Sequence, residues 1–339
     1  MHLLRLTLSL SLLLLSQAPG TGHAKTLSNI SKKGFIQCGV SQGLPGFSTP
    51  DKQGKWQGID VDFCRALAAA ILKDSKKVRF TPLSAKERFT ALQSGEVDLL
   101  SRNTTWTLVR DTKLGLDFAG VIYYDGQGFM VRKTLGVKSA KELDGATVCV
   151  NIGTTTELNV GDFFRKHGMK YKLVSYEKDD EVIAAYDSGR CDTYTTDQSG
   201  LYANRIKLKK PSDHMILPEI ISKEPLGPVI RHGDDQWADI VRWTLYALIE
   251  AEELGVTSKN VAQMKKSKNP HIRRLLGVEG GMGKNLGLNN DWVVNMIESV
   301  GNYQEIFDRN LGPASPLKIA RGQNALWNQG GLLYPMPVR

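Results

Sequence analysis

Groups that recognise small charged molecules are concentrated in the segment 101–110, "SRNTTWTLVR", directly after an apolar run that predicts a strand. Arg110 carries a planar guanidinium, which binds a carboxylate through two parallel hydrogen bonds. Asn103, Thr104 and Thr105 add further donors and acceptors. The segment therefore predicts half of a binding site for an anionic group.

A second set of such groups lies later in the chain. Thr154, Thr155 and Thr156 stand at a predicted helix start, where free backbone N–H groups and the helix dipole favour an anion. Asp197 ends a predicted strand and supplies a negative charge for an ammonium group. A fork for a carboxylate and an acid for an ammonium group together complement the backbone of a free amino acid.

Each group also has a plainer structural interpretation. Arg110 suits a surface ion pair, Thr154–Thr156 suit a helix cap, and Asp197 suits the N-cap of the segment 198–205. Their shared position favours the binding site, because ligands of open α/β sheets bind beyond the carboxyl ends of the strands.

The elements that must position these groups alternate between strands and helices. The sequence predicts strands at 36–40, 78–83 and 97–100 and helices at 59–74 and 85–95. Gly43 and Leu44 follow the first strand, so we expect them at the same end of the sheet as Arg110. The alternation predicts a mainly parallel sheet with helices on both faces.

The same order of elements recurs in the next part of the chain. Strands are predicted at 146–152, 171–176 and 191–197 and helices at 155–168 and 179–189. Segments 91–103 and 185–197 share an outline, a helix that ends in Ser-Gly and a strand with a polar end, which places Asn103 opposite Asp197. The recurrence favours two similar α/β lobes, although any two α/β units share such an outline.

Two extended stretches, 120–133 and 221–234, predict two crossovers between the lobes. We expect lobe 1 to comprise residues 25–130 and 224–339, and lobe 2 to comprise residues 131–223. Two lobes joined in this way form a clamshell that closes on a ligand.

The first 24 of the 339 residues predict a secretory signal peptide. Arg5 precedes a leucine-rich core at 6–15, which is short for a membrane span, and small residues lead to a cut after about Ala24. The alternative is an uncleaved anchor. Removing the segment lowers the net charge from +9 to +8. The remaining basic residues are scattered, so we expect no nucleic-acid partner.

The four cysteines allow three disulfide connectivities, and an even count in an exported chain favours disulfides. No CxxC spacing is present, so we expect no metal site. The pairs Cys38–Cys64 and Cys149–Cys191 are favoured because each falls within one predicted lobe. Buried free thiols are the alternative.

Several motifs resemble one known family. "GIDVDF" (58–63) resembles the short signature of the polar amino-acid family, family 3, of bacterial solute-binding proteins. "NTTWTLVR", "GTTTELN" and "GRCDTYTTDQSG" resemble its ligand-binding segments, and "NALWNQGG" and "LGLNNDWVVNMIESVGNYQEIF" resemble its general L-amino-acid-binding subgroup. The resemblance covers nearly all of the mature chain.

The resemblance implies a two-lobed periplasmic-binding fold of type II with two hinge strands. It implies a monomer in the periplasm that captures an L-amino acid by closing its lobes and delivers it to an inner-membrane ABC permease. No cofactor and no catalysis are implied.

Individual residues match the family's motif. Arg110 corresponds to the arginine that grips the α-carboxylate, and Thr105 to the hydroxyl residue that helps to hold the same group. Thr155 matches the second-lobe threonine at the helix start. Asp197 matches the acid that holds the α-ammonium group, while Asn103 and Thr104 match other contact positions.

One position departs from the family. Leu44 stands where many members have an aromatic residue over the ligand, so an aromatic sandwich is in doubt. Whether Arg102 and Trp106 touch the ligand is left open.

Two other classes share this fold: periplasmic enzymes, namely dehydratases and peptidoglycan lyases, and sensory ligand-binding inputs. An enzyme needs a general acid or base, often Glu or His. None of the six histidines falls at a predicted strand end, and Glu157 is assigned to a capping box with Thr154. The sequence therefore favours binding over catalysis, and the sensory alternative stays open.

Overall fold

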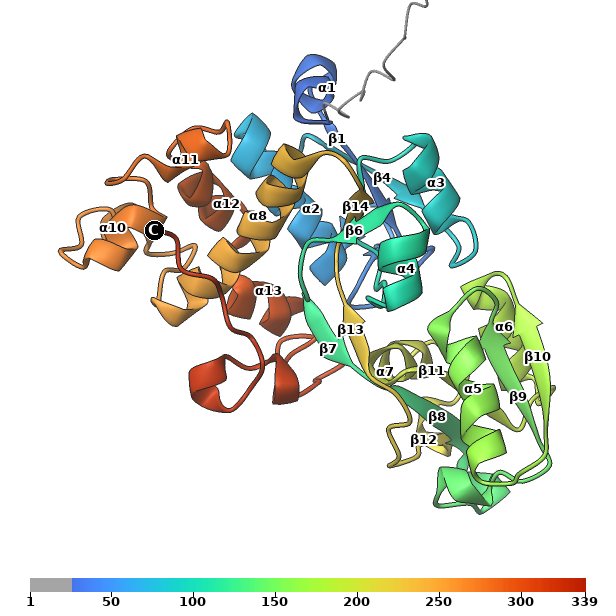
Figure 1. Ribbon diagram of the computed structural model, residues 1–339. Coiled ribbons are helices and arrows are strands. Elements are labelled where there is room, and N and C mark those ends of the chain that lie inside the picture. Colours follow the sequence, from blue (N-terminus) through green and yellow to red (C-terminus); the bar gives the residue numbers. More distant parts are fainter. Residues whose placement is uncertain (1–25) are drawn as a thin grey trace, which may run out of the picture.

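The computed structural model describes residues 26–339, so the predicted signal peptide lies outside the described residues. Within them, the chain forms two bodies, each built on a five-stranded sheet, joined by extended segments (Figure 1). None of the helices in residues 26–339 is long and apolar enough to cross a membrane.

The first sheet has the order β4-β1-β5-β14-β6. Its strands are β1 (Ile36–Val40), β4 (Val78–Pro82), β5 (Leu99–Leu100), β6 (Leu116–Phe118) and β14 (Val229–Arg231). Side chains alternate between its two faces, so Leu99 joins the core under one face and Leu100 the core under the other. Helices cover both faces: α1 (Thr26–Lys33), α2 (Ile59–Leu72), α3 (Arg88–Ser94), α4 (Leu108–Lys113) and α8 (Asp235–Glu253) pack in this lobe.

The second sheet repeats this layout with the order β10-β9-β11-β8-β12. Its strands are β8 (Gln127–Arg132), β9 (Ala146–Asn151), β10 (Tyr171–Tyr176), β11 (Thr193–Asp197) and β12 (His214–Ile216). Its helices are α5 (Thr155–Lys166), α6 (Asp179–Asp187) and α7 (Gln198–Arg205). In the first sheet β1 lies between β4 and β5, and in the second β9 lies in the same way between β10 and β11, so the two lobes share one architecture.

The expectation of a mainly parallel sheet is wrong in its detail. Each sheet combines two parallel pairings with two antiparallel pairings. The antiparallel strands β14 and β8 are those that enter each sheet from a crossover. Parallel neighbours need a long connection, usually a helix. β8 and β14 instead enter their sheets directly from a crossover and run antiparallel to their neighbours.

Two short strands, β7 (Tyr123–Asp125) and β13 (Glu224–Leu226), pair antiparallel between the lobes (Figure 1). Their register places Glu224 opposite Asp125. β8 begins at Gln127, before the expected lobe boundary at residue 130, because the chain enters the second sheet directly after β7.

The disulfides join Cys38 to Cys64 and Cys149 to Cys191, the two pairs that the sequence favoured. The first ties β1 to α2, and the second ties β9 to the start of β11. Each bond therefore fixes a helix or strand to the sheet of its own lobe, close to the strands that carry the candidate site.

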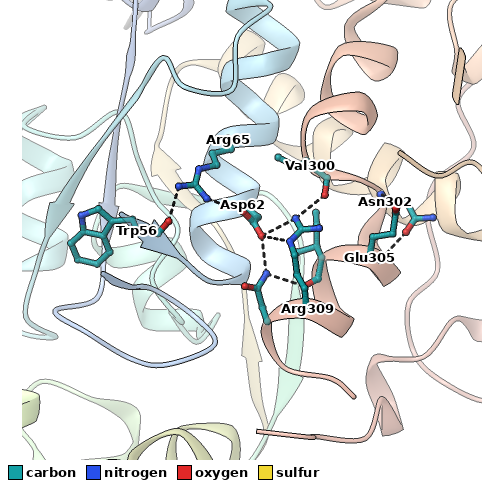
Figure 2. A network of polar contacts seen from close by, with 9 residues as sticks. Trp56, Asp62, Arg65, Val300, Asn302, Glu305 and Arg309 are labelled. Carbon is teal, nitrogen blue, oxygen red and sulfur yellow. Dashed lines mark hydrogen bonds and ion pairs between the residues drawn. The ribbon is translucent and has the colours of Figure 1, made fainter. Parts of the chain in front are cut away.

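The signature "GIDVDF" opens α2, and its second acid connects α2 to the C-terminal helices. Asp62 accepts hydrogen bonds from Arg65 on its own helix and from Arg309 on α13 (Tyr303–Asn310), as Figure 2 shows. Asn310 of α13 donates to the same carboxylate at 2.8 Å. Asp62 is buried, and its two arginine partners and the Asn310 amide offset its desolvation. The C-terminal region is thereby fixed to lobe 1, where α12 (Trp292–Val300) also packs on α2.

The remaining elements are short. They are β2 (Thr49–Pro50), β3 (Trp56–Gln57), α9 (Val261–Met264), α10 (Pro270–Leu275), α11 (Met282–Asn285) and the 3₁₀ turns η1 (Lys133–Leu135), η2 (Ala140–Glu142), η3 (Pro211–Asp213), η4 (Gly322–Asn324) and η5 (Trp327–Gln329).

The C-terminal segment contacts the hinge strand β7 directly. The buried Asn324 accepts a hydrogen bond from the Tyr124 backbone N–H at 2.7 Å and donates one to the Tyr124 carbonyl at 3.0 Å. The Tyr303 hydroxyl donates to the Ile122 carbonyl at 2.7 Å. β7 has a paired strand, β13, on one side only. The hydrogen bonds of Asn324 and Tyr303 satisfy backbone groups of this crossover that no second strand pairs.

We expect Asn324→Ala to lower the free energy of unfolding by about 1–3 kcal/mol, because it leaves both Tyr124 backbone groups without their partner. Urea denaturation measures the change. Asn328→Ala, at an exposed position of the same segment, is the matched control and should have little effect. Equal stabilities of the two variants would contradict the prediction.

Candidate functional site

A small cavity of about 40 Å³ lies between the lobes, where the carboxyl ends of strands from both sheets meet. Four of the predicted site residues line it: Leu44, Asn103, Thr154 and Asp197. Further lining comes from residues that the prediction left open or did not include: Ala85, Arg102, Asn151, Asp179, Tyr194, Thr196, Ser199, Gly200 and Asn204.

The two lobes are in contact beside this cavity. The hydroxyl oxygens of Thr105 and Thr155 lie 3.3 Å apart, although one follows β5 and the other opens α5. Gly153 approaches lobe 1 so closely that a Cβ there would lie 3.3 Å from the Lys86 Cα atom. The structure therefore brings the two halves of the predicted site together.

The loop that carries Asn103 is held by the first acid of the "GIDVDF" signature. The Asn103 backbone N–H donates to Asp60 Oδ2 at 3.0 Å, and the Ser101 hydroxyl donates to Asp60 Oδ1 at 3.1 Å. Asn103 has a φ of 31°, which few residues other than glycine adopt. Asp60 is buried, and burial raises the pKa of its carboxyl to about 7.

We expect Asp60→Asn to flatten the pH dependence of stability. A carboxyl whose pKa is raised from 3.8 to about 7 by folding binds its proton more tightly in the folded state, so stability falls as the pH rises through this range. Without this group, the fall between pH 5 and pH 7.5 should be smaller by about 2–3 kcal/mol. Urea denaturation at both pH values measures it.

Asp213→Asn, at an exposed position, is the control and should keep the pH dependence of the wild type. A fall in stability that is the same in Asp60→Asn and in the wild type would contradict the prediction.

Arg110 lies in the first turn of α4, whose N-cap is the Thr107 hydroxyl. It is buried, and its Nη1 donates to the Thr105 carbonyl at 2.9 Å. Burial lowers its pKa to about 10, against the opposing charges of Glu224 and Asp197, so the guanidinium stays charged at neutral pH. Arg110 is therefore a fixed positive charge beside the threonine that touches the second lobe.

Two further buried arginines accompany it. Arg102 lines the cavity, and its Nε donates to the Leu83 carbonyl at 3.0 Å. Arg88 donates to the Thr104 hydroxyl at 3.4 Å, and its Nε has no partner among the described residues. Burial lowers the pKa values of both, and Arg110 adds to the effect on Arg88. The site thus concentrates positive charge on the lobe 1 side.

Trp106 stands apart from the cavity. Its ring stacks on Phe118 with centroids 5.5 Å apart, and its backbone N–H donates to the Pro225 carbonyl. It is not among the described residues that line the cavity. Six of the predicted site residues do not line it either: Gly43, Thr104, Thr105, Arg110, Thr155 and Thr156. Gly43 has a φ of 137°, so it serves the turn of its loop, and the Thr156 hydroxyl donates to Thr154.

The start of α5 differs from the prediction in one respect. Thr154 caps the helix by accepting from the Glu157 backbone N–H at 3.1 Å, as its structural interpretation predicts. Thr155 donates instead to Glu224 Oε2 at 2.8 Å. A carboxylate of the chain itself therefore lies at the helix start, where the sequence predicted a ligand's anion. Thr105 and Thr155 border a different space, an outer groove of about 590 Å³.

Asp197 ends β11 and faces the cavity. It precedes α7, but its side chain makes no capping hydrogen bond. It is only 7% exposed, and no side chain or backbone N–H of the described residues donates to its carboxylate. Burial raises its pKa well above the ordinary value, and the carboxylates of Asp125 and Glu224 add to the shift. A cationic partner in the cavity would offset this cost.

Of the site residues that were not predicted, some are marked by a local pattern in the sequence and others are not. Asn151 ends β9 and donates to Asp179 at 3.0 Å, so the rule that selected Asp197 at a strand end would also have selected Asn151. Glu224 lies within the second crossover and 119 positions from Thr105. No local pattern marks it, because only the pairing of β13 with β7 and the bridge from Leu226 to Thr105 bring it to the site.

Comparisons with known proteins agree with this geometry. The general L-amino acid-binding periplasmic protein AapJ of Rhizobium johnstonii is 62% identical over 327 residues, which cover 96% of both chains. The glutamate/glutamine/aspartate/asparagine-binding protein BztA of Rhodobacter capsulatus is 54% identical over 97% of this chain and 98% of its own.

A solved structure of an ABC transporter periplasmic binding protein from Brucella ovis, with glutathione bound, superposes with a TM-score of 0.92. It is 63% identical and covers 94% of this chain and 100% of its own. The model of the bacterial extracellular solute-binding proteins, family 3, matches residues 36–260. The chain belongs to the family 3 bacterial extracellular solute-binding proteins.

Proposed function

We propose that the protein binds free L-amino acids in the cavity between its lobes and hands them to an ABC transporter permease in the inner membrane. The observation that carries this proposal is Asp197, a buried carboxylate that faces the cavity without a donor from the described residues. An α-ammonium group supplies both a charge and the missing donors.

The complementary half is Arg110. The described residues take one hydrogen bond from its guanidinium, to the Thr105 carbonyl, and a guanidinium has five N–H donors. The other donors suit a ligand's α-carboxylate. Asn103, Thr104 and Thr105 on lobe 1 and Thr154, Thr155 and Thr156 on lobe 2 complete the proposed site, with Gly43 and Leu44 shaping its first-strand loop.

Closure follows from this division of the site. Arg110 belongs to lobe 1 and Asp197 to lobe 2, so a ligand gains both charge pairs only when the lobes meet. Such a ligand shifts the population toward the closed arrangement by its differential affinity. The hinge comprises β7 and β13. Because β8 begins at Gln127, we place lobe 1 at about 26–126 with 222–339 and lobe 2 at about 127–221.

The relatives reported above are named as binding proteins, and the chain is accordingly a solute-binding protein and not an enzyme. Export to the periplasm after cleavage near Ala24, action as a monomer and the identity of the permease are parts of the proposal.

A thermal-shift screen of the purified protein against the twenty L-amino acids and glutathione tests the proposal. We expect several amino acids to raise the melting temperature, since ligand that binds only the folded state stabilises it. A screen in which no amino acid shifts the melting temperature would contradict the proposal. If glutathione alone raises the melting temperature, the ligand is a peptide and not a free amino acid.

A further inference from the structure

Glu224 receives hydrogen bonds from both lobes at once. Its Oε2 accepts from the Thr105 hydroxyl at 2.6 Å and from the Thr155 hydroxyl at 2.8 Å. Its Oε1 accepts from Asn159 Nδ2 at 2.8 Å and from the Ser222 hydroxyl at 2.5 Å. These four bonds fill the acceptor capacity of one carboxylate.

The side chain moves with lobe 1. Glu224 begins β13, and β13 is joined to lobe 1 by a bridge between Leu226 and Thr105. The backbone N–H of Trp106 donates to the Pro225 carbonyl, and that of Gly227 donates to the Thr104 carbonyl. The contacts that separate when the lobes open are therefore those to Thr155 and Asn159 on α5, whereas Ser222 stands two positions before Glu224 in the same crossover.

Burial and the nearby start of α5 strengthen the hydrogen bonds that Thr155 and Asn159 donate to Glu224. Glu224 is 1% exposed, and Thr155 and Asn159 belong to the first two turns of α5. A carboxylate near a helix N-terminus is favoured by the helix dipole, and hydrogen bonds to a charged group are stronger than those between neutral groups. Opening the lobes leaves the carboxylate with donors from Thr105 and Ser222 only.

We propose that Glu224 is an interlobe latch, a positioning residue that stabilises the closed arrangement by binding Thr155 and Asn159 across the cleft. The proposal rests on lobe closure as the mode of action described above. It adds that part of the free energy of lobe closure comes from hydrogen bonds within the protein and not from the ligand. The latch therefore slows the release of a bound ligand without touching it.

The first test needs no ligand. Spin labels at Lys113→Cys on lobe 1 and Lys172→Cys on lobe 2, both exposed positions, report the distance between the lobes. We expect Glu224→Ala to reduce the closed fraction about tenfold relative to the wild type. Glu224→Gln keeps the shape of the side chain but loses the charge and turns one acceptor into a donor, and should fall between the two.

Two further variants separate a latch from general damage. Ser222→Ala removes a hydrogen bond to Glu224 from a residue two positions away and should leave the closed fraction nearly unchanged. Asn159→Ala should act in the same direction as Glu224→Ala. Combining them should add nothing to Glu224→Ala, because that variant already removes the hydrogen bond that Asn159 makes. Circular dichroism melting confirms that each variant is folded.

The second test uses L-glutamate as the probe and stopped-flow dissociation as the readout. We expect Glu224→Ala to release it about ten times faster than the wild type. An unchanged closed fraction, or tighter binding of L-glutamate by Glu224→Ala, would overturn the latch; tighter binding would show that Glu224 competes with the ligand's carboxylate. A distance shift in Glu224→Ala, together with a wild type that binds none of the twenty L-amino acids, would support the latch and contradict the proposed function.

Discussion

Arg110→Ala is expected to weaken the binding of every amino-acid ligand by at least about 100-fold. The variant removes the proposed partner of the α-carboxylate, a group that all such ligands share. Truncating one member of a buried, hydrogen-bonded charge pair lowers affinity by about 2–5 kcal/mol, and 100-fold corresponds to about 2.8 kcal/mol. Isothermal titration calorimetry with L-glutamate measures the loss.

Two variants make this result specific. Arg110→Lys keeps the charge but not the fork, so it should bind more weakly than the wild type and more tightly than Arg110→Ala. Arg242→Ala, on α8, changes only surface ion pairs and should bind as the wild type does. Unchanged affinity of Arg110→Ala would remove Arg110 from the site.

Asp197→Asn is expected to lose ligand affinity by at least about 100-fold and yet to raise the melting temperature at neutral pH without ligand. The affinity falls because the α-ammonium group loses its charged partner. The stability rises because folding raises the pKa of Asp197. At pH 7 the unfolded chain releases this proton more readily than the folded chain, so the carboxyl destabilises the folded state and its removal stabilises it. Site residues that oppose stability in this way are common.

The sign of the second effect depends on pH. Below the ordinary pKa of 3.8 the carboxyl is protonated in both states, and it destabilises the fold progressively as the pH rises above that value. The gain in melting temperature of Asp197→Asn should therefore be larger at pH 7 than at pH 4. Thermal melts at both pH values, with and without L-glutamate, measure both effects. A variant that is less stable than the wild type at pH 7 would contradict this account.

The sequence predicted most strands of both sheets because each is a short apolar run between turn residues. Strand 36–40 and strand 171–176 agree with β1 and β10 at both ends. The helix expected at 85–95 begins only at Arg88, since residues 85–87 form a turn that the box of Ser84 and Glu87 stabilises. Helix α4 was not predicted, although Thr107 caps it.

The sequence predicts the site residues that stand at the ends of strands. It does not predict those that contacts between distant parts of the chain bring to the site. Asp197 and Asn103 follow strands, so the rule for strand ends finds them. Glu224 and Arg88 reach the site through contacts with residues 119 and 16 positions away. Their roles depend on the register of β13 and on the burial of α3, and neither property is encoded in a short motif.

The central claim is that the cavity recognises an α-ammonium group and an α-carboxylate together. Calorimetric titration of the wild type with L-glutamate, with glutarate, which lacks the amino group, and with isoglutamine, whose α-carboxylate is an amide, tests it most directly. The account predicts that L-glutamate binds with one site per chain and that each analogue binds at least about 100-fold more weakly. Glutarate or isoglutamine binding as tightly as L-glutamate would contradict it.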